Sequence, residues 1–177
     1  SSPVNLYGAT KLASDKLCAL VRKKTYNTTL LLGVTGSGKT EVYLDAVSQA
    51  LQQGQQVLVL VPEIALSIDF VKRGIARYQS KPGEWHSGVQ KKERLRLYKA
   101  VARNDVQLVI GARSALFLPF ADLGLIIVDE EHDGSYKQEE GITYNARDMA
   151  VMRGSILRAQ VILASATPSL ETWVNTQ

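Results

Sequence analysis

The chain carries Gly33-Val34-Thr35-Gly36-Ser37-Gly38-Lys39-Thr40 between the apolar run Leu30-Leu31-Leu32 and a helical pattern. This stretch fits the phosphate-binding loop pattern G-x-x-x-x-G-K-[ST] at every position. Its glycines allow backbone N–H groups to turn inward around phosphates, the Lys39 ammonium can reach the β- and γ-phosphates, and the Thr40 hydroxyl can ligate Mg²⁺. We therefore predict that the whole loop binds a nucleoside triphosphate and that Lys39 also takes part in catalysis. A glycine-rich strand-to-helix turn without a ligand is the alternative.

An acidic box follows about ninety residues later, within the usual separation of such motifs. A buried strand is predicted at residues 125–128, which are apolar without alternation, and Asp129-Glu130-Glu131-His132 comes directly after it. Carboxylates at the carboxyl end of such a strand face the crevice where ligands bind. We expect Asp129 to hold Mg²⁺ with Thr40, Glu130 to orient and deprotonate the attacking water, and His132 to lie at the nucleotide site. An ordinary acidic loop is the alternative.

A third motif follows another expected strand. Residues 161–164 are apolar throughout, and Ser165-Ala166-Thr167-Pro168 comes next. The hydroxyls of Ser165 and Thr167 are expected to reach His132 and the carboxylates, so that a ligand bound nearby would sense the nucleotide state. Thr167 ahead of Pro168 is also a good helix N-cap.

Together these three motifs resemble motifs I, II and III of superfamily 2 helicases of the DEAH-like kind. Further strings are similar to those of the bacterial primosomal protein N′ (PriA) family of replication-restart helicases, namely Gly38 to Tyr43, Val61 to Leu66, His86-Ser87-Gly88, Gly111 to Phe117, Asp129 to Asp133, Ser135 to Gln138 and Ala164 to Thr172. The resemblance implies a 3′-to-5′ DNA helicase that uses ATP and Mg²⁺. Its implied partners are single-stranded or forked DNA and, through the full-length protein, the proteins of replication restart and primosome assembly.

The same resemblance implies contacts with DNA at two turns that follow strands. Backbone N–H groups and polar side chains there are expected to bind phosphates, which fixes position without reading bases. The residues concerned are Pro62, Glu63, Ser67, Arg113 and Ser114. Ordinary strand-to-helix turns are the alternative.

A loop after the acidic box interleaves aromatic and cationic residues. Tyr136, Lys137, Tyr144 and Arg147 surround the polar stretch Gln138-Glu139-Glu140-Gly141. Aromatic rings stack on unpaired bases and cations bind phosphates, so this segment is predicted to be a mobile loop that senses single-stranded DNA and reports to Glu130. The family carries an aromatic-rich loop at this place, although Ile142 stands here where an aromatic is usual. A loop packed on its own lobe is the alternative.

Strands and helices are expected to alternate through the rest of the chain. Helices are predicted at about 39–53, 67–79, 90–103 and 146–158, and strands at 56–61, near 85, at 106–110, at 125–128 and from 161. The continuous apolar strands indicate an α/β fold whose central parallel sheet has helices on both faces. With the resemblance, residues 21–177 are interpreted as one domain, the first RecA-like lobe of a P-loop NTPase, containing motifs I, Ia, Ib, II and III.

Residues 1–20 depart from the family. Where the helicases usually have a glutamine that reads adenine, this chain has Tyr7 and Lys11, in the Tyr-x-x-x-Lys spacing of short-chain dehydrogenases that act on nucleotide sugars. No dinucleotide-binding fold precedes the pair, so we expect an atypical helix or a leader without redox activity. A nucleotide-sugar dehydrogenase is the weakest of the functional alternatives.

Neither a second lobe nor the zinc-binding module of the family is found in the sequence. The second lobe would supply an arginine that is worth on the order of a thousandfold in turnover, so the lobe by itself is expected to bind nucleotide and hydrolyse it slowly. A non-catalytic fragment that binds nucleotide and DNA is the other alternative.

Composition agrees with this interpretation. A net charge of +4 and a pI near 9.2 favour a polyanionic partner. The single cysteine, Cys18, can form neither a disulfide framework nor a zinc cluster. We find no run that is long enough to span a membrane and no signal peptide, and we expect a cytoplasmic protein.

Overall fold

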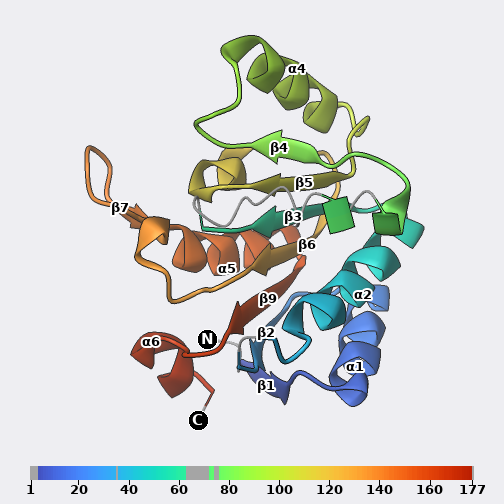
Figure 1. Cartoon of the computed structure of the whole chain (residues 1–177), viewed down its shortest axis with the longest axis vertical. Helices are drawn as coiled ribbons and strands as arrows, with labels where there is room; N and C mark the ends of the chain where they lie inside the picture. The colour runs from blue at the N-terminus through green and yellow to red at the C-terminus, as the bar shows by residue number, and fades with distance from the viewer. Residues whose placement is uncertain (1–3, 35, 63–71, 74–75, 177) are drawn as a thin grey trace.

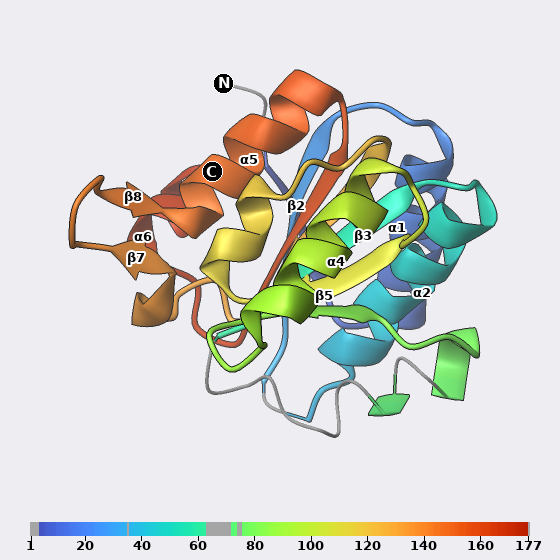
Figure 2. The same ribbon diagram turned by 90° about the horizontal axis from the view of Figure 1, so that it is seen from above.

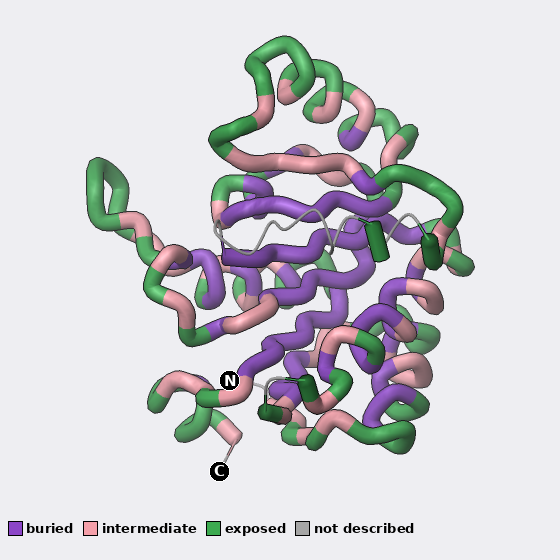
Figure 3. The backbone as a smooth tube through the Cα atoms, viewed as in Figure 1, coloured by how far each residue is buried: buried purple, intermediate pink, exposed green. Residues whose placement is uncertain are grey.

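The centre of the computed structural model, which describes residues 4–34, 36–62, 72–73 and 76–176, is a parallel sheet (Figure 1). Its seven strands lie in the order β1-β2-β9-β6-β3-β5-β4. In chain order they are β1 (Asn5–Gly8), β2 (Asn27–Leu32), β3 (Gln56–Leu60), β4 (Gly83–Trp85), β5 (Leu108–Gly111), β6 (Leu123–Val128) and β9 (Gln160–Ser165). Because β-branched and leucine side chains run along both faces of the central strands, these strands are buried on both sides (Figure 3).

Helices cover the two faces, as the sequence predicts for an α/β fold (Figure 2). Helices α1 (Lys11–Arg22) and α2 (Lys39–Gln52) pack on one face, where Val57 and Val59 of β3 point. Leu58 and Leu60 point to the other face, which is covered by α5 (Ala146–Leu157) and the 3₁₀ helix η2 (Arg113–Phe117). Helix α4 (Lys91–Ala102) lies along the β4 edge and buries Val101 alone among its described residues.

The three motif-bearing strands are neighbours in the sheet. Strand β9 lies between β2 and β6, with Leu32 opposite Ser165 and Val128 opposite Leu163. The phosphate loop, the acidic box and the third motif therefore leave the sheet at the same carboxyl edge, which is where open α/β sheets bind ligands. The convergence predicted from the sequence is confirmed in the backbone.

The N-terminal segment differs from its prediction. Strand β1 pairs in parallel with β2, Tyr7 lying opposite Leu31, and α1 packs against α2. The side chain of Thr10 caps α1 by accepting the N–H of Ala13, so the helix begins at Lys11. The predicted helix is present from Lys11, whereas the strand over Asn5–Gly8 was not predicted, and both belong to the core of the lobe. Tyr7 lies on the strand, so Tyr7 and Lys11 do not share one helix as the dehydrogenase motif requires.

Two details near the C-terminus also differ. The polar segment after the box forms 3₁₀ helix η3 (Gly134–Tyr136) and an antiparallel hairpin of β7 (Lys137–Gln138) and β8 (Tyr144–Asn145). Helix α6 (Leu170–Val174) is capped by Ser169, whose hydroxyl accepts the N–H of Thr172 at 3.2 Å, and not by Thr167.

The predicted helix at 67–79 falls largely outside the described residues. Among the helices that are described, none combines the length and the apolar character that crossing a membrane requires.

Candidate nucleotide-binding site

The phosphate loop has the backbone that its glycines permit. Gly36 and Gly38 have φ angles of 79° and 88°, in the left-handed region that side chains disfavour. A Cβ atom at Gly33 would lie 2.2 Å from the Ser37 hydroxyl oxygen, so the loop closes tightly there. That oxygen is buried and has no hydrogen-bond partner among the described residues. Val34 is exposed, and Thr35 lies outside the described residues.

Lys39 points back into this loop. Its side chain is buried, and its ammonium donates to the carbonyl of Gly33 and to that of Val34, the latter at 3.3 Å. A buried ammonium satisfied by loop carbonyls is poised to exchange them for phosphate oxygens at the same place. The donor set thus fits the phosphate-binding role predicted for residues 33–40.

Asp129 and Thr40 meet around Tyr43. The Tyr43 hydroxyl donates to Asp129 Oδ2 at 2.9 Å, and the Thr40 side chain offsets part of the rise that burial imposes on the pKa of Tyr43. Burial raises the pKa of Asp129, and the hydrogen bond from Tyr43 offsets part of that rise. A hydroxyl and a carboxylate oxygen are ligands that Mg²⁺ accepts, so the two predicted metal ligands are brought together. Tyr43 was missed as a site residue, although its place three residues after Thr40 puts it on the same helix face.

Glu130 and His132 lie at the open edge of the site. Glu130 has a φ of 47°, and its side chain is 38% exposed. Its Oε2 lies 3.8 Å from His132 Nε2, while His132 Nδ1 lies 2.7 Å from the hydroxyl of buried Ser165. The predicted contact between Ser165 and His132 is therefore present. Thr167 is exposed and contributes its backbone N–H to Ser165 Oγ at 3.1 Å.

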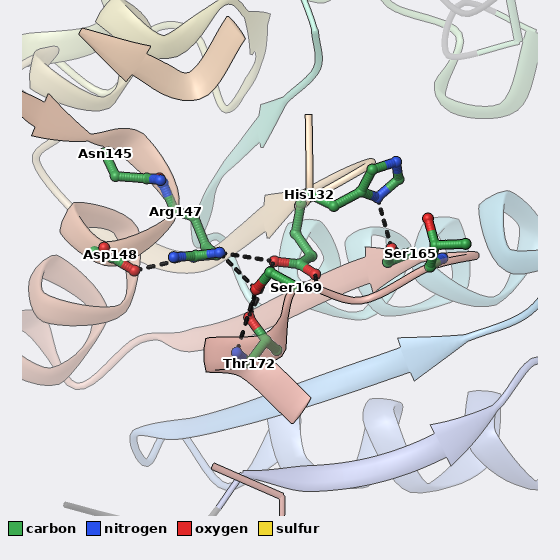
Figure 4. A network of polar contacts seen from close by, with 9 residues as sticks. His132, Asn145, Arg147, Asp148, Ser165, Ser169 and Thr172 are labelled. Atoms are coloured by element: carbon green, nitrogen blue, oxygen red, sulfur yellow. Dashed lines mark hydrogen bonds and ion pairs between the residues drawn. The ribbon is translucent and has the colours of Figure 1, made fainter. Parts of the chain in front are cut away.

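Glu131, to which no role was assigned, is the most enclosed residue of the box, and its neighbours Arg147, Ser169 and Thr172 lie close together (Figure 4). Its side chain is 0% exposed and accepts from the Ser169 N–H at 2.8 Å and the Thr172 hydroxyl at 3.0 Å. Arg147 Nη1 lies 3.4 Å from Glu131 Oε2 and 2.6 Å from Ser169 Oγ. Burial opposes the charge of Arg147, but Asp148 and Glu131 hold its pKa above that of a free guanidinium.

Two of the predicted DNA contacts therefore need correction. Arg147 is 8% exposed and engaged as just described, and Tyr136 is 1% exposed. The Tyr136 hydroxyl donates to the carbonyls of Leu60 at 3.1 Å and Asp129 at 2.5 Å, and burial raises its pKa strongly. Neither side chain is accessible for stacking on bases or binding phosphates. Each side chain instead contacts the acidic box, Tyr136 at the Asp129 carbonyl and Arg147 at the Glu131 carboxylate.

The remaining residues of that segment form a packed hairpin. Lys137 is exposed, and the half-buried ring of Tyr144 meets Phe117 edge to face with centroids 5.2 Å apart. Arg113 donates to the carbonyls of Ser135 at 3.0 Å and Lys137 at 2.6 Å. The hairpin is thus tied to η2, which favours the alternative of a loop packed on its own lobe.

The turns predicted to contact DNA are only partly described. Ser114 is exposed and accepts from Trp85 Nε1 at 3.0 Å, and Pro62 is buried. Glu63 and Ser67 lie outside the described residues. Arg113 and Ser114 line a polar cavity of about 210 Å³ together with His86, Arg94 and Tyr144.

Residues 17–175 match the DEAD/DEAH box helicase family. Because this match covers most of the chain and includes each motif described above, the chain belongs to that family. Among curated relatives it is similar to the Replication restart protein PriA of Rickettsia felis, with 48% identity over 161 residues, 91% of this chain and 25% of that protein. It is 41% identical to the Replication restart protein PriA of Bacillus subtilis over 177 residues, all of this chain and 22% of that protein.

These matches confirm the family resemblance drawn from the motifs, and the chain spans about a quarter of the length of these relatives. Solved helicases share the fold at lower identity. RecG bound to a three-way DNA junction matches 94% of this chain and 23% of its own, with a TM-score of 0.62 and 20% identity. MrfA bound to DNA and AMPPNP matches 93% of this chain and 25% of its own, with a TM-score of 0.65 and 21% identity. The predicted RecA-like helicase fold is confirmed.

Proposed function

We propose that this chain is the ATP-binding lobe of a 3′-to-5′ DNA helicase that acts in replication restart. The observation that carries the proposal is the convergence of Lys39, Asp129 and Ser165 at the carboxyl ends of adjacent strands β2, β6 and β9. Nearly half of the aligned residues are identical to those of replication restart proteins, which supports the biological process.

The site residues divide the work of hydrolysis. The phosphate loop and the Lys39 ammonium would hold the triphosphate, and Thr40 and Asp129 would hold Mg²⁺. The ion, when bound, neutralises charge that develops on the phosphates. Glu130 would orient a water molecule and take its proton, while Ser165 keeps the ring of His132 at the edge of the site. We infer that the bound nucleotide is ATP because the chain belongs to the DEAD/DEAH box helicase family.

DNA would lie across the same carboxyl edge of the sheet. Ser114, Lys137 and Thr167 are exposed there, each in a segment that follows a strand, and Arg94 and His86 add positive or polar groups beside Ser114. Such contacts would bind phosphates without reading sequence. The solved RecG and MrfA helicases are DNA-bound proteins of this fold, which supports DNA as the partner.

A steady-state ATPase assay tests the proposal. This chain should bind ATP·Mg²⁺ with slow turnover, and the longer protein that includes the second lobe should hydrolyse ATP faster when single-stranded DNA is added. Unwinding of duplexes with a 3′ tail against a 5′ tail then tests the direction. Absence of any ATP-induced rise in the unfolding temperature, or a rise with NAD instead, would overturn the assignment.

A further inference from the structure

Glu131 is a buried carboxylate directly beside the residue to which we assign the water-activating role. Its contacts come from segments 16, 38 and 41 residues away in the chain, namely Arg147 in α5, Ser169 at the cap of α6 and Thr172 within α6 (Figure 4). The hydrogen bonds described for the Glu131 side chain are thus all made with residues outside the acidic box. A surface carboxylate would have no need of this set of donors.

Stability alone does not explain such an arrangement. Replacing a buried ion pair by apolar residues of similar volume is often neutral or stabilising, because the desolvation of both charges offsets their attraction. The distance of 3.4 Å between Arg147 Nη1 and Glu131 Oε2 is also long for a charge-assisted hydrogen bond. What a buried pair can supply is one fixed arrangement of the backbone that carries it.

The backbone of the box does need to be fixed. Glu130 has a φ of 47°, a conformation that disfavours a residue with a side chain and persists only when its surroundings over-determine it. Two backbone hydrogen bonds hold the chain next to Glu130. The N–H of Glu131 donates to the Ala164 carbonyl at 3.1 Å, and the N–H of Asp133 donates to the Glu130 carbonyl at 2.8 Å. The side chain of Glu131 adds anchors to α5 and α6, at the residue that follows the strained one.

We propose that Glu131 is a positioning residue for catalysis, which holds Glu130 in its left-handed conformation by fastening the acidic box to Arg147, Ser169 and Thr172. The proposal rests on the proposed function, because it takes Glu130 as the group that activates water. Lys39, Thr40 and Asp129 do not touch the Glu131 cluster in the contacts described. Loss of the cluster should therefore affect turnover and leave nucleotide binding in place.

The test is Glu131→Gln in the full-length helicase that carries this lobe, with kcat, the KM for ATP and the Kd of a non-hydrolysable ATP analogue measured together. We expect kcat to fall about a hundredfold, since a catalytic group displaced by about an ångström can lose that much. The analogue's Kd should stay within about twofold of wild type. Thr172→Val removes one hydroxyl donor and should lower kcat about fivefold, the worth of one net hydrogen bond.

Two control variants separate positioning from general damage. Glu93→Gln makes the same chemical change in the exposed Glu93–Arg96 pair of α4. Val101→Ala removes core volume where α4 packs along the β4 edge of the sheet. Neither should change kcat by more than about twofold.

The proposal is overturned if folded Glu131→Gln keeps its kcat, or if kcat and analogue affinity fall together with the unfolding temperature, which is the pattern of general damage. If Glu131→Gln does not fold, an unchanged kcat in Thr172→Val overturns it. A wild-type protein that binds the analogue but has no turnover would instead refute the proposed function, and this proposal with it.

Discussion

Replacing Arg147 by Met tests whether this residue is a structural cation or a DNA contact. Arg147 is 8% exposed and its partner Glu131 is fully enclosed, so the change leaves a buried carboxylate without its counter-charge. Breaking a buried pair from one side costs about 3–5 kcal/mol. Glu131 keeps the Ser169 N–H at 2.8 Å and the Thr172 hydroxyl at 3.0 Å, which places the cost at the lower end, about 3 kcal/mol.

The lost contact with Asp148 adds little, because that carboxylate is 66% exposed and surface pairs contribute about 0–1 kcal/mol. For a chain of this length each kcal/mol shifts the unfolding temperature by about 2–4 °C, so Arg147→Met should unfold about 6–12 °C below wild type. In the double variant with Glu131→Gln part of the loss should be recovered, since no unpaired buried charge remains.

Thermal unfolding followed by circular dichroism measures the effect, and fluorescence anisotropy with labelled single-stranded DNA measures binding. Lys137→Met is the matched control, because Lys137 is an exposed cation of the adjoining hairpin. It should leave the unfolding temperature unchanged and weaken DNA binding. An Arg147→Met protein that is as stable as wild type but binds DNA weakly would refute the structural role and restore the DNA contact predicted from the sequence.

Three further predictions concern the nucleotide site. Lys39→Ala should abolish ATP binding in titration calorimetry while the chain stays folded, and unchanged affinity would reject the phosphate-loop assignment. Glu130→Gln should keep nucleotide and Mg²⁺ binding but lower turnover about a hundredfold or more in the two-lobe protein, because an amide cannot accept the proton; a loss under about tenfold would show that Glu130 is not the base. Asp129→Asn should abolish Mg²⁺-dependent binding and yet stabilise the ligand-free chain. Burial raises the pKa of Asp129 in the folded protein. The charged carboxylate therefore does not lower the free energy of unfolding below the unfolded pKa of 3.8, and it lowers that free energy progressively as pH rises through the folded pKa. Urea midpoints of wild type and Asp129→Asn that do not diverge as pH rises would contradict this.

The nucleotide site was largely predictable because its residues are set by local rules. Apolar runs without alternation identify buried strands, and polar residues that directly follow such strands in a parallel sheet share one edge. Gly36 and Gly38 occupy positions where the backbone requires them. The order of strands was not predictable in this way, because pairing of β9 between β2 and β6 depends on tertiary packing.

The segment after the box was less predictable because burial there depends on distant partners. Alternating aromatic and cationic residues in a polar stretch are typical of a nucleic-acid loop. Tyr136 is nevertheless buried, because its hydroxyl satisfies carbonyls of Leu60 and Asp129, and Arg147 is buried because Glu131 needs a counter-charge. A third carboxylate in the box, to which neither Mg²⁺ nor the attacking water was assigned, was a signal that a buried cation should be sought.

The N-terminal segment shows why a residue spacing indicates function only together with local structure. Tyr7 and Lys11 lie four apart, which places two side chains on one face only if both are within one helix. Thr10 stands between them, and its side chain accepts the N–H of Ala13, as an N-cap does. The cap sets the start of α1 at Lys11 and leaves Tyr7 to strand β1, where its ring lies 5.1 Å from the ammonium of Lys16. A polar residue with the propensity of a cap thus excludes the dehydrogenase interpretation on physical grounds, before any likeness to a family is considered.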